Sequence, residues 1–270
     1  MTEIKHILVA SDLTDRSCLA LGRAIRLKRA SAAALTLLHV IEPGLTEELE
    51  HNRRAAARAT LEAHLSQASH EELRRVVIEV LVGDPVATIV AESEARGADL
   101  IVLGEPAKRR LKELFVGTTA ERVVRNSQRP VVVVKTQSDG PYQRVVVAFD
   151  LSEAAERVLD TALSLAPHAQ FRLVHASGSG GAEERERTRG YLDDATKQMR
   201  DRSAYPSARM ALEVVEGHPA SVVANARAAF DADLLATGTH GRGRLQTAFL
   251  GSVAQELAAT SACDILVTRP

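Results

Sequence analysis

The sequence repeats itself in tandem, and this repeat constrains the fold more than any other feature. Four apolar or glycine-containing segments of the first half recur in the second half, in the same order and at nearly the same spacing. The matched pairs are residues 7–12 and 145–150, 37–40 and 173–176, 82–85 and 216–219, and 98–104 and 232–238. Chance does not keep four such pairs in register, so we predict two copies of one domain. A polar, turn-forming stretch with adjacent Gly and Pro separates the copies, which we place at residues 1–137 and 142–270.

Within each copy, short runs rich in Val, Ile and Leu alternate with longer stretches of helical period. In the first copy we predict strands at residues 4–10, 34–41, 75–82, 99–104 and 130–135, and helices at residues 15–30, 46–70, 85–97 and 118–127. The strand runs are continuously apolar, which indicates a parallel sheet covered by helices on both faces. The chain is therefore expected to be an α/β protein of two tandem, doubly wound, Rossmann-like domains.

Composition excludes several classes of partner. Lys and Arg number 34 against 35 Asp and Glu, so the net charge of −1 gives no basic surface for a nucleic acid or an acidic membrane. No run of about 18 apolar residues could span a bilayer, and the N-terminus has no signal-peptide pattern. Cys18 and Cys263 are the only cysteines, far apart and outside any zinc or disulfide motif. We expect a cytoplasmic protein that binds a small molecule or another protein, without a metal site.

A glycine-rich loop follows the predicted fourth strand of the second copy. In a doubly wound sheet, ligands bind beyond the carboxyl ends of the strands. Gly238 and Gly241 lack a Cβ atom, so their backbone N–H groups can curl around an anion. A helix that begins near Gly251 and Ser252 would add free N–H groups and the positive end of its dipole. The loop therefore predicts a phosphate site.

These residues resemble the ATP-binding signature of the universal stress protein family. The signature reads Gly238-x2-Gly241-x9-Gly251-Ser252, and the resemblance covers nearly the whole chain, twice. It implies a five-stranded parallel sheet in each domain and ATP, with or without Mg²⁺, as ligand. It also implies that the two domains pair as a pseudo-dimer, commonly through their last strands, and a homodimer of chains is a further possibility.

The resemblance also assigns roles to residues of the second copy. The glycines and the serine would hold the phosphates and the ribose. The Asp after the first strand and main-chain groups near the end of the second strand would hold the nucleoside. The expected nucleotide-binding set is Asp150, Ala176, Gly238, Gly241, Gly251 and Ser252.

The first copy departs from this signature. Its fourth strand leads into Gly104, Glu105, Pro106 and Ala107, so an alanine stands at the second glycine position. The added Cβ, the proline without an N–H and the carboxylate all oppose a close-fitting phosphate. The basic run at residues 108–112 could attract an anion, although such runs are usually solvated loops. We expect one competent nucleotide site per chain, in the C-terminal domain, and one degenerate or weak site in the first copy.

Three functions stay open at this point. The leading one is a regulatory stress protein that binds ATP and hydrolyses it slowly or not at all. The second is an enzyme, such as a slow ATPase, but the chain has no G-x4-G-K-[ST] loop and no evident catalytic base, so no catalytic residue is assigned. The third is a nucleotide-independent stress factor that acts through protein contacts. Asp12 and Asp150 also have a plainer interpretation as helix caps, and His39 and His175 as structural histidines.

Overall fold

The computed structural model describes residues 3–66, 68–105, 118–150, 152–177, 209–239 and 250–269, with a few isolated positions between 186 and 197. The chain divides into two compact units, which we call the first unit (Glu3–Gly140) and the second unit (Pro141–Pro270). Each unit is described by itself.

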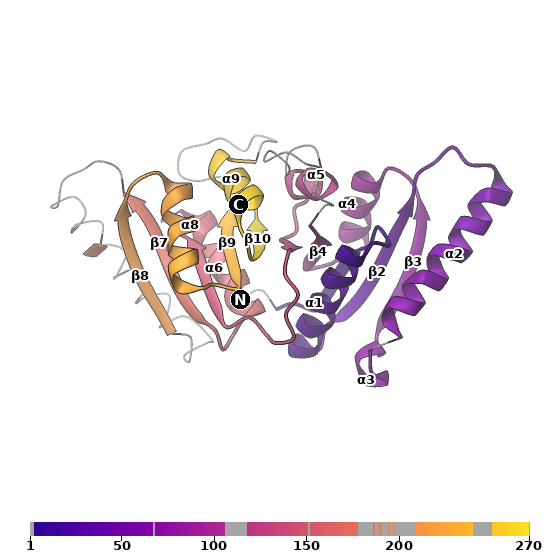
Figure 1. The fold of residues 1–270 in the computed structure, drawn as a ribbon, viewed down its shortest axis with the longest axis horizontal. Coiled ribbons are helices and arrows are strands. Elements are labelled where there is room, and N and C mark those ends of the chain that lie inside the picture. Colours follow the sequence, from indigo (N-terminus) through magenta and orange to yellow (C-terminus); the bar gives the residue numbers. More distant parts are fainter. Residues whose placement is uncertain are drawn as a thin grey trace. The chain divides into compact units, whose positions relative to one another are not determined.

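The first unit contains a five-stranded parallel sheet in the order β3-β2-β1-β4-β5 (Figure 1). Its strands are β1 (His6–Ala10), β2 (Ala34–Ile41), β3 (Val76–Val82), β4 (Leu100–Gly104) and β5 (Val131–Val134). Its helices are α1 (Asp15–Ser31), α2 (Glu47–Leu65), α3 (His70–Leu73), α4 (Pro85–Ala95) and α5 (Thr119–Asn126). Strand β1 pairs with β2 on one side and β4 on the other, so the chain reverses its direction of winding beside β1.

The second unit repeats this topology, with a parallel sheet in the order β8-β7-β6-β9-β10. Its strands are β6 (Arg144–Ala148), β7 (Gln170–Ser177), β8 (Arg209–Glu216), β9 (Leu234–Gly238) and β10 (Asp264–Thr268). The helices described are α6 (Glu153–Leu165), α8 (Pro219–Phe230) and α9 (Ser252–Thr260). The prediction of two tandem, doubly wound α/β domains is confirmed.

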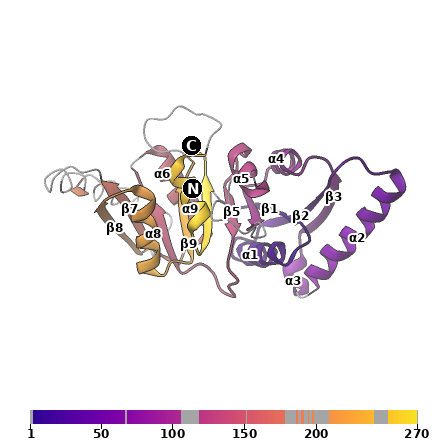
Figure 2. The same cartoon turned by 45° about the horizontal axis from the view of Figure 1, so that its top comes forward.

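Helices cover both faces of each sheet. In the first unit, α1 lies on one face, while α4 and α5 contact each other on the opposite face (Figure 2). The middle residues of the central strands are fully buried as a result, among them Leu8 in β1 and Val146 in β6. Burying a Val or Leu side chain stabilises a fold by about 1.5–3 kcal/mol. This double burial explains why the middle residues of the central strands are apolar without alternation.

The elements of the first unit agree with the expected ranges, apart from one helix. We expected a single helix over residues 46–70, but α2 ends at Leu65 and α3 begins at His70. Ser69 causes this break because its hydroxyl accepts a bond from the N–H of Glu72, whose carboxylate accepts one from the N–H of Ser69. Such a reciprocal capping box starts a new helix.

An aspartate holds the start of the central strand in each unit. Oδ2 of Asp99 accepts hydrogen bonds from the backbone N–H groups of Lys5 and His6, at 2.8 and 3.0 Å. Asp233 accepts the two equivalent bonds at the start of β6, at 2.8 and 3.1 Å. The repeated sequence Ala-Asp-Leu therefore joins the beginnings of two neighbouring strands in both units.

Strand β3 forms one edge of the first sheet, and helix α2 supplies side chains to it. Arg54 Nη1 donates to the carbonyl oxygen of Val80 at 2.6 Å, and Arg58 Nη1 lies 3.5 Å from that of Ile78. These guanidinium groups bond to carbonyls that a neighbouring strand would otherwise use.

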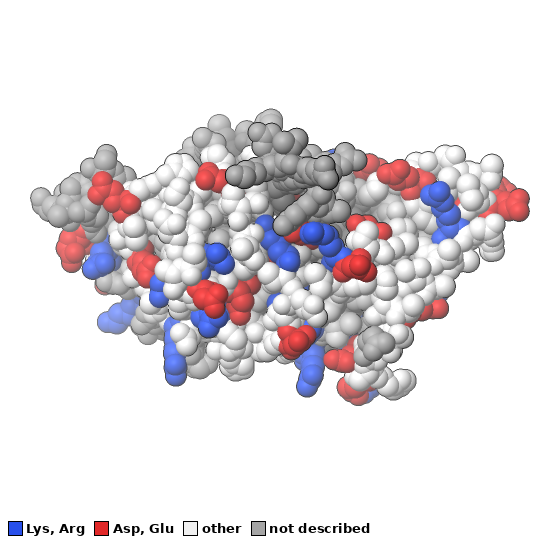
Figure 3. Space-filling view, in the orientation of Figure 1, with Lys and Arg blue, Asp and Glu red and all other residues white. Residues whose placement is uncertain are grey.

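On the face drawn in Figure 3, the acidic and basic side chains of the described residues are interspersed, in keeping with the net charge of −1. Within the described part of the chain, the helices are all too short or too polar to cross a bilayer.

Candidate functional site

A cavity of about 210 Å³ lies at the carboxyl ends of β6, β7 and β9 in the second unit. Three of the predicted nucleotide-binding residues line it, namely Asp150, Ala176 and Gly238. Val253, in the first turn of α9, lines it as well. The carboxyl ends of adjacent parallel strands meet at one edge of the sheet, which brings together residues far apart in the sequence.

Asp150 fixes the turn between β6 and α6. Its Oδ1 accepts bonds from the backbone N–H and the hydroxyl of Ser152, at 3.1 and 2.6 Å. Ser152, rather than Asp150, is the N-cap of α6, and its hydroxyl accepts a bond from the N–H of Ala155. In the first unit, Asp12 holds the N-cap residue Thr14 in the same way. The interpretation of the two aspartates as helix caps is therefore wrong, because each binds the cap residue instead.

The equivalent residues His39 and His175 bond to the backbone of the turns that Asp12 and Asp150 hold. Nδ1 of His175 bonds to the carbonyl oxygen of Phe149 at 2.9 Å, and Nδ1 of His39 bonds to that of Ser11 at 2.8 Å. A carbonyl only accepts, so Nδ1 is the donor in both. These contacts give both histidines a structural role. No group of three His, Cys, Asp or Glu side chains that could hold a metal occurs among the described residues.

The N-terminus of α9 borders the cavity of the second unit. Its N-cap is Gly251, which has no side chain to cap the first turn. The N–H of Gly251 donates to the carbonyl oxygen of Thr239 at 2.7 Å, and Ser252 is exposed. Gly251 has φ −60°, a value open to any residue. Gly241 lies outside the described residues.

Sequence reasoning missed Thr239, which directly follows Gly238. Its side chain is buried, with 2% of the residue exposed. Its N–H donates to the carbonyl oxygen of Thr268 at 2.9 Å, so it joins the ends of β9 and β10 as well as the start of α9. The sequence signal that could have pointed to Thr239 is that it is uncharged, whereas the equivalent residue of the first unit is Glu105.

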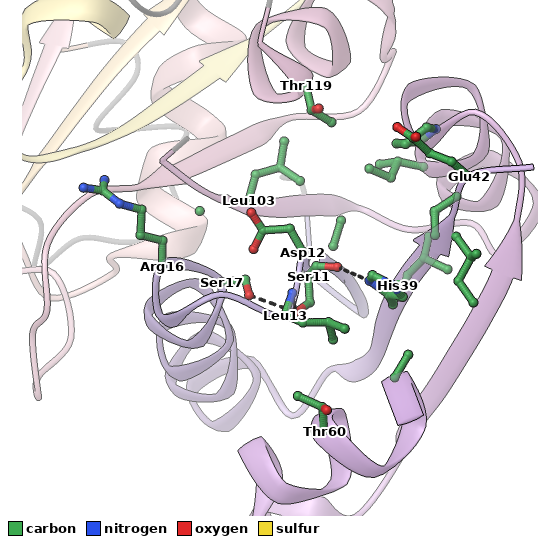
Figure 4. Close-up of a pocket in the computed structure, with 18 of the residues that line it drawn as sticks. Ser11, Asp12, Leu13, Arg16, Ser17, His39, Glu42, Thr60, Leu103 and Thr119 are labelled. Carbon is green, nitrogen blue, oxygen red and sulfur yellow. Dashed lines mark hydrogen bonds between the residues drawn. The ribbon is translucent and has the colours of Figure 1, made fainter. Parts of the chain in front are cut away.

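The first unit contains a cavity of about 610 Å³ at the equivalent place (Figure 4). Asp12, His39 and Gly104 line it, as their counterparts line the cavity of the second unit. Figure 4 shows the Asp12 side chain beside Leu103, with Thr119 of α5 at one end of the pocket and Thr60 of α2 at the other. The sequence did not indicate this cavity, because one wall comes from helix α2.

Glu105 lines the same cavity and is held by two cations. Its carboxylate lies 2.8 Å from Arg16 Nη1 and 3.7 Å from Lys135 Nζ. Next to it, a Cβ added to Gly104 would lie 2.8 Å from the carbonyl oxygen of Arg16. Glycine is therefore required at the end of β4 by the close approach of α1, independently of any ligand.

The topology and the paired cavities define a tandem Rossmann-like α/β protein with a pocket at the switch point of each sheet. The model of the universal stress protein family matches residues 3–135 and again residues 141–269, and the chain belongs to this family.

Similar proteins agree with this assignment. A universal stress protein of Mycolicibacterium smegmatis is 25% identical over 291 residues, covering 98% of this chain and 97% of the relative. Universal stress protein MJ0577 of Methanocaldococcus jannaschii is 28% identical over 156 residues, covering 50% of this chain and 96% of the relative. The crystal structure of a universal stress protein from Archaeoglobus fulgidus has the same fold, with a TM-score of 0.74, 22% identity and 98% of both chains covered.

Proposed function

We propose that the protein binds one ATP per chain, in the cavity of the second unit, and that it acts as a regulatory stress protein whose associations depend on the bound nucleotide. The observation that carries the proposal is the uncapped N-terminus of α9 beside a cavity that Asp150 and Gly238 line. The N–H groups of a helix N-terminus bind phosphate without further cations.

The chemistry of the cavity suits a nucleoside with its phosphates outside. About 210 Å³ is less than the roughly 300–1,000 Å³ of common ligand pockets, so the cavity would take the nucleoside part alone. The carboxylate of Asp150 can accept from ribose hydroxyls, and the main chain at Ala176 can bond to the base. The phosphates would then lie along the mouth, at α9 and the loop that contains Gly241. Where Mg²⁺ accompanies the ATP, the phosphates would hold it, since Mg²⁺ needs few protein ligands.

No residue of the described site is assigned a catalytic role, and we propose that hydrolysis is slow or absent. Asp150 already accepts two hydrogen bonds within its own turn. The ring of His175 donates to the backbone carbonyl of Phe149. A general base has to reach the attacking water. A phosphate-release assay with excess ATP tests this part of the proposal.

We further propose that the two domains, residues 1–137 and 142–270, pair through β5 and β10. Within its own unit each strand lies at the edge, with β5 beside β4 and β10 beside β9, and both strands are rich in apolar residues. Such edges favour pairing with another strand. Co-expression of the domains as separate chains, one of them tagged, should give a stable complex, and two monomers would contradict the pairing. A cytoplasmic location is proposed as well, since Cys18 and Cys263 are thiols rather than halves of a disulfide.

Calorimetric titration of the full chain with ATP tests the main proposal. A stoichiometry near one is expected, with binding lost when Asp150 is replaced by Asn and kept when Asp12 is. Absence of ATP binding would leave the alternative of a nucleotide-independent stress factor. Binding lost only in the Asp12 variant would contradict the assignment to the second unit.

A further inference from the structure

The first-unit cavity keeps the features that we assign to the nucleoside in the second unit. Asp12 and Asp150 each hold the backbone N–H two residues further on, at 3.1 Å. His39 and His175 each bond through Nδ1 to a carbonyl of the turn after the central strand. Among the described residues, no donor reaches Oδ2 of Asp12, so this oxygen is available to a ligand hydroxyl. A volume of about 610 Å³ falls within the roughly 300–1,000 Å³ of common ligand pockets.

After β4 the first unit has a charged residue, Glu105, where the second unit has the neutral Thr239 after β9. The N–H of Glu105 donates to the carbonyl of Val134 in β5, as the N–H of Thr239 donates to that of Thr268 in β10, both at 2.9 Å. The two units therefore share this backbone bond and differ here in the side chain, which is a carboxylate in the first unit. Glu105 is the side chain that would face the phosphates of a nucleotide bound as in the second unit.

Among the described residues, two cations pair with the carboxylate of Glu105. Arg16 Nη1 lies 2.8 Å from one of its oxygens, and Lys135 Nζ lies 3.7 Å from the other. The side chain of Lys135 is only 4% exposed, so it cannot turn outward to meet another anion. Glu105 thus acts as an internal anion that takes the donors a phosphate would need.

The start of α5 is also satisfied internally, unlike that of α9. The hydroxyl of Thr118 accepts a bond from the N–H of Glu121 at 3.1 Å, whereas Gly251 leaves α9 without a side-chain cap. Glu121 is fully buried in the first turn of α5, where it compensates the helix dipole and pairs with Arg125. At the third helical position, where α5 has Glu121, α9 has the neutral Ala254. This helix N-terminus attracts an anion less than α9 does.

We propose that the first-unit cavity binds an uncharged nucleoside and that Glu105 excludes its phosphorylated forms. The choice of a nucleoside rests on the function proposed for the second unit, while the role of Glu105 rests on its ion pairs alone. Asp12 accepts from the ribose hydroxyls, and Glu105 closes the pocket to the phosphate tail. The two units of one chain would then respond to different phosphorylation states of one compound.

The test uses the full chain and equilibrium dialysis with labelled ATP and labelled adenosine. The wild-type chain should bind one ATP and, with ATP saturating, one adenosine that ATP does not displace. Glu105→Thr introduces the residue of the second unit, and Glu105→Gln removes only the charge. Both variants should bind a second ATP, with first-unit affinity raised at least about tenfold over wild type. Glu105→Asp, which keeps the charge, should behave as wild type.

Further variants separate the two units, and melting curves show that each variant folds. Asp12→Asn combined with Glu105→Thr should remove the second ATP and leave the first. A wild-type chain that binds two ATP, or one ATP in both charge-removing variants, would overturn the role of Glu105. A chain saturated with ATP that binds no adenosine would overturn the ligand class. If only the charge-removing variants bound ATP, the role of Glu105 would stand and the function proposed for the second unit would fail.

Discussion

The Tyr142 hydroxyl donates a hydrogen bond of 2.9 Å to Oδ2 of Asp264, a residue 122 positions further along the chain. Both residues are buried, with 2% and 0% of their surfaces exposed. A buried carboxylate is costly unless donors satisfy it. The bond therefore joins the segment before β6 to the start of β10 and fixes the two ends of the second unit to each other.

Replacing Tyr142 by Phe should destabilise the second unit. The substitution keeps the ring but removes a donor from a buried carboxylate, and such a loss costs about 1–3 kcal/mol. Urea denaturation measures the free energy of unfolding. In a double-mutant cycle with Asp264→Asn, the two effects should be clearly non-additive. Additive losses would mean that this hydrogen bond contributes nothing of its own.

Replacing Gly241 by Val should weaken ATP binding and leave the fold intact. A branched Cβ would intrude on backbone expected to approach the phosphates. The loss of two charge-assisted bonds of roughly 1.5–3 kcal/mol each corresponds to about a 10²- to 10⁴-fold drop in affinity.

Ser252→Ala is the matched variant for Gly241→Val, because it removes one exposed hydroxyl and keeps the helix N-terminus. Its effect on ATP affinity should be much smaller. Calorimetry and thermal melting on both variants provide the comparison. If the Gly241 variant bound ATP as the wild type does, with an unchanged melting curve, the loop would be a turn without a phosphate site.

Replacing Gly104 by Ala should lower the melting temperature of the chain. The new Cβ would lie 2.8 Å from the carbonyl oxygen of Arg16, so α1 or β4 would have to shift. Overpacking of this kind costs about 1–3 kcal/mol. Gly140→Ala is the control, since a Cβ there meets no atom within 4 Å. Equal melting curves for the two variants would show that the end of β4 is not a close contact.

Cys18 should react slowly with alkylating agents near neutral pH. Burial raises the pKa of its thiol, and the carboxylates of Asp15 and Asp12 raise it further, so the thiolate is scarce until the pH is high. The rate of iodoacetamide labelling against pH measures this, with Cys18→Ser as the blank. Asp15→Asn should increase the rate modestly, because one negative charge is removed. Half-maximal reactivity below about pH 8.5, the ordinary value for cysteine, would contradict the expected direction.

The central strands could be predicted because their middle residues are buried on both faces and so are apolar without alternation. The break between α2 and α3 was visible in principle, since Ser69 and Glu72 have the spacing of a capping box. The long alanine- and arginine-rich helical period around them concealed it. A local signal of three or four residues is easily outweighed by a periodic pattern over twenty.

The residues of the candidate site could be predicted where the order of strands along the chain alone determines their place in the sheet. Asp150, Ala176 and Gly238 end neighbouring parallel strands, and they line one cavity for that reason. The ion pair of Glu105 with Arg16 was not predictable, since 89 residues separate them and only the packing of α1 against β4 brings them together. The sequence indicated that Glu105 is unusual, whereas the structure shows which cations it occupies.

The guanidinium group of Arg54 on the outer edge of β3 has a consequence for how the protein behaves at high concentration. A sheet gains a further strand when the carbonyls of its edge strand accept hydrogen bonds from the N–H groups of an incoming strand. The carbonyl of Val80 is already bonded to Arg54, so a strand arriving from another molecule would have to displace a charged donor. This edge of the sheet therefore resists the edge-to-edge pairing of strands from which fibrous aggregates form. Replacing Arg54 would free this carbonyl and favour self-association of the protein, without changing any residue of the two cavities' proposed ligand contacts.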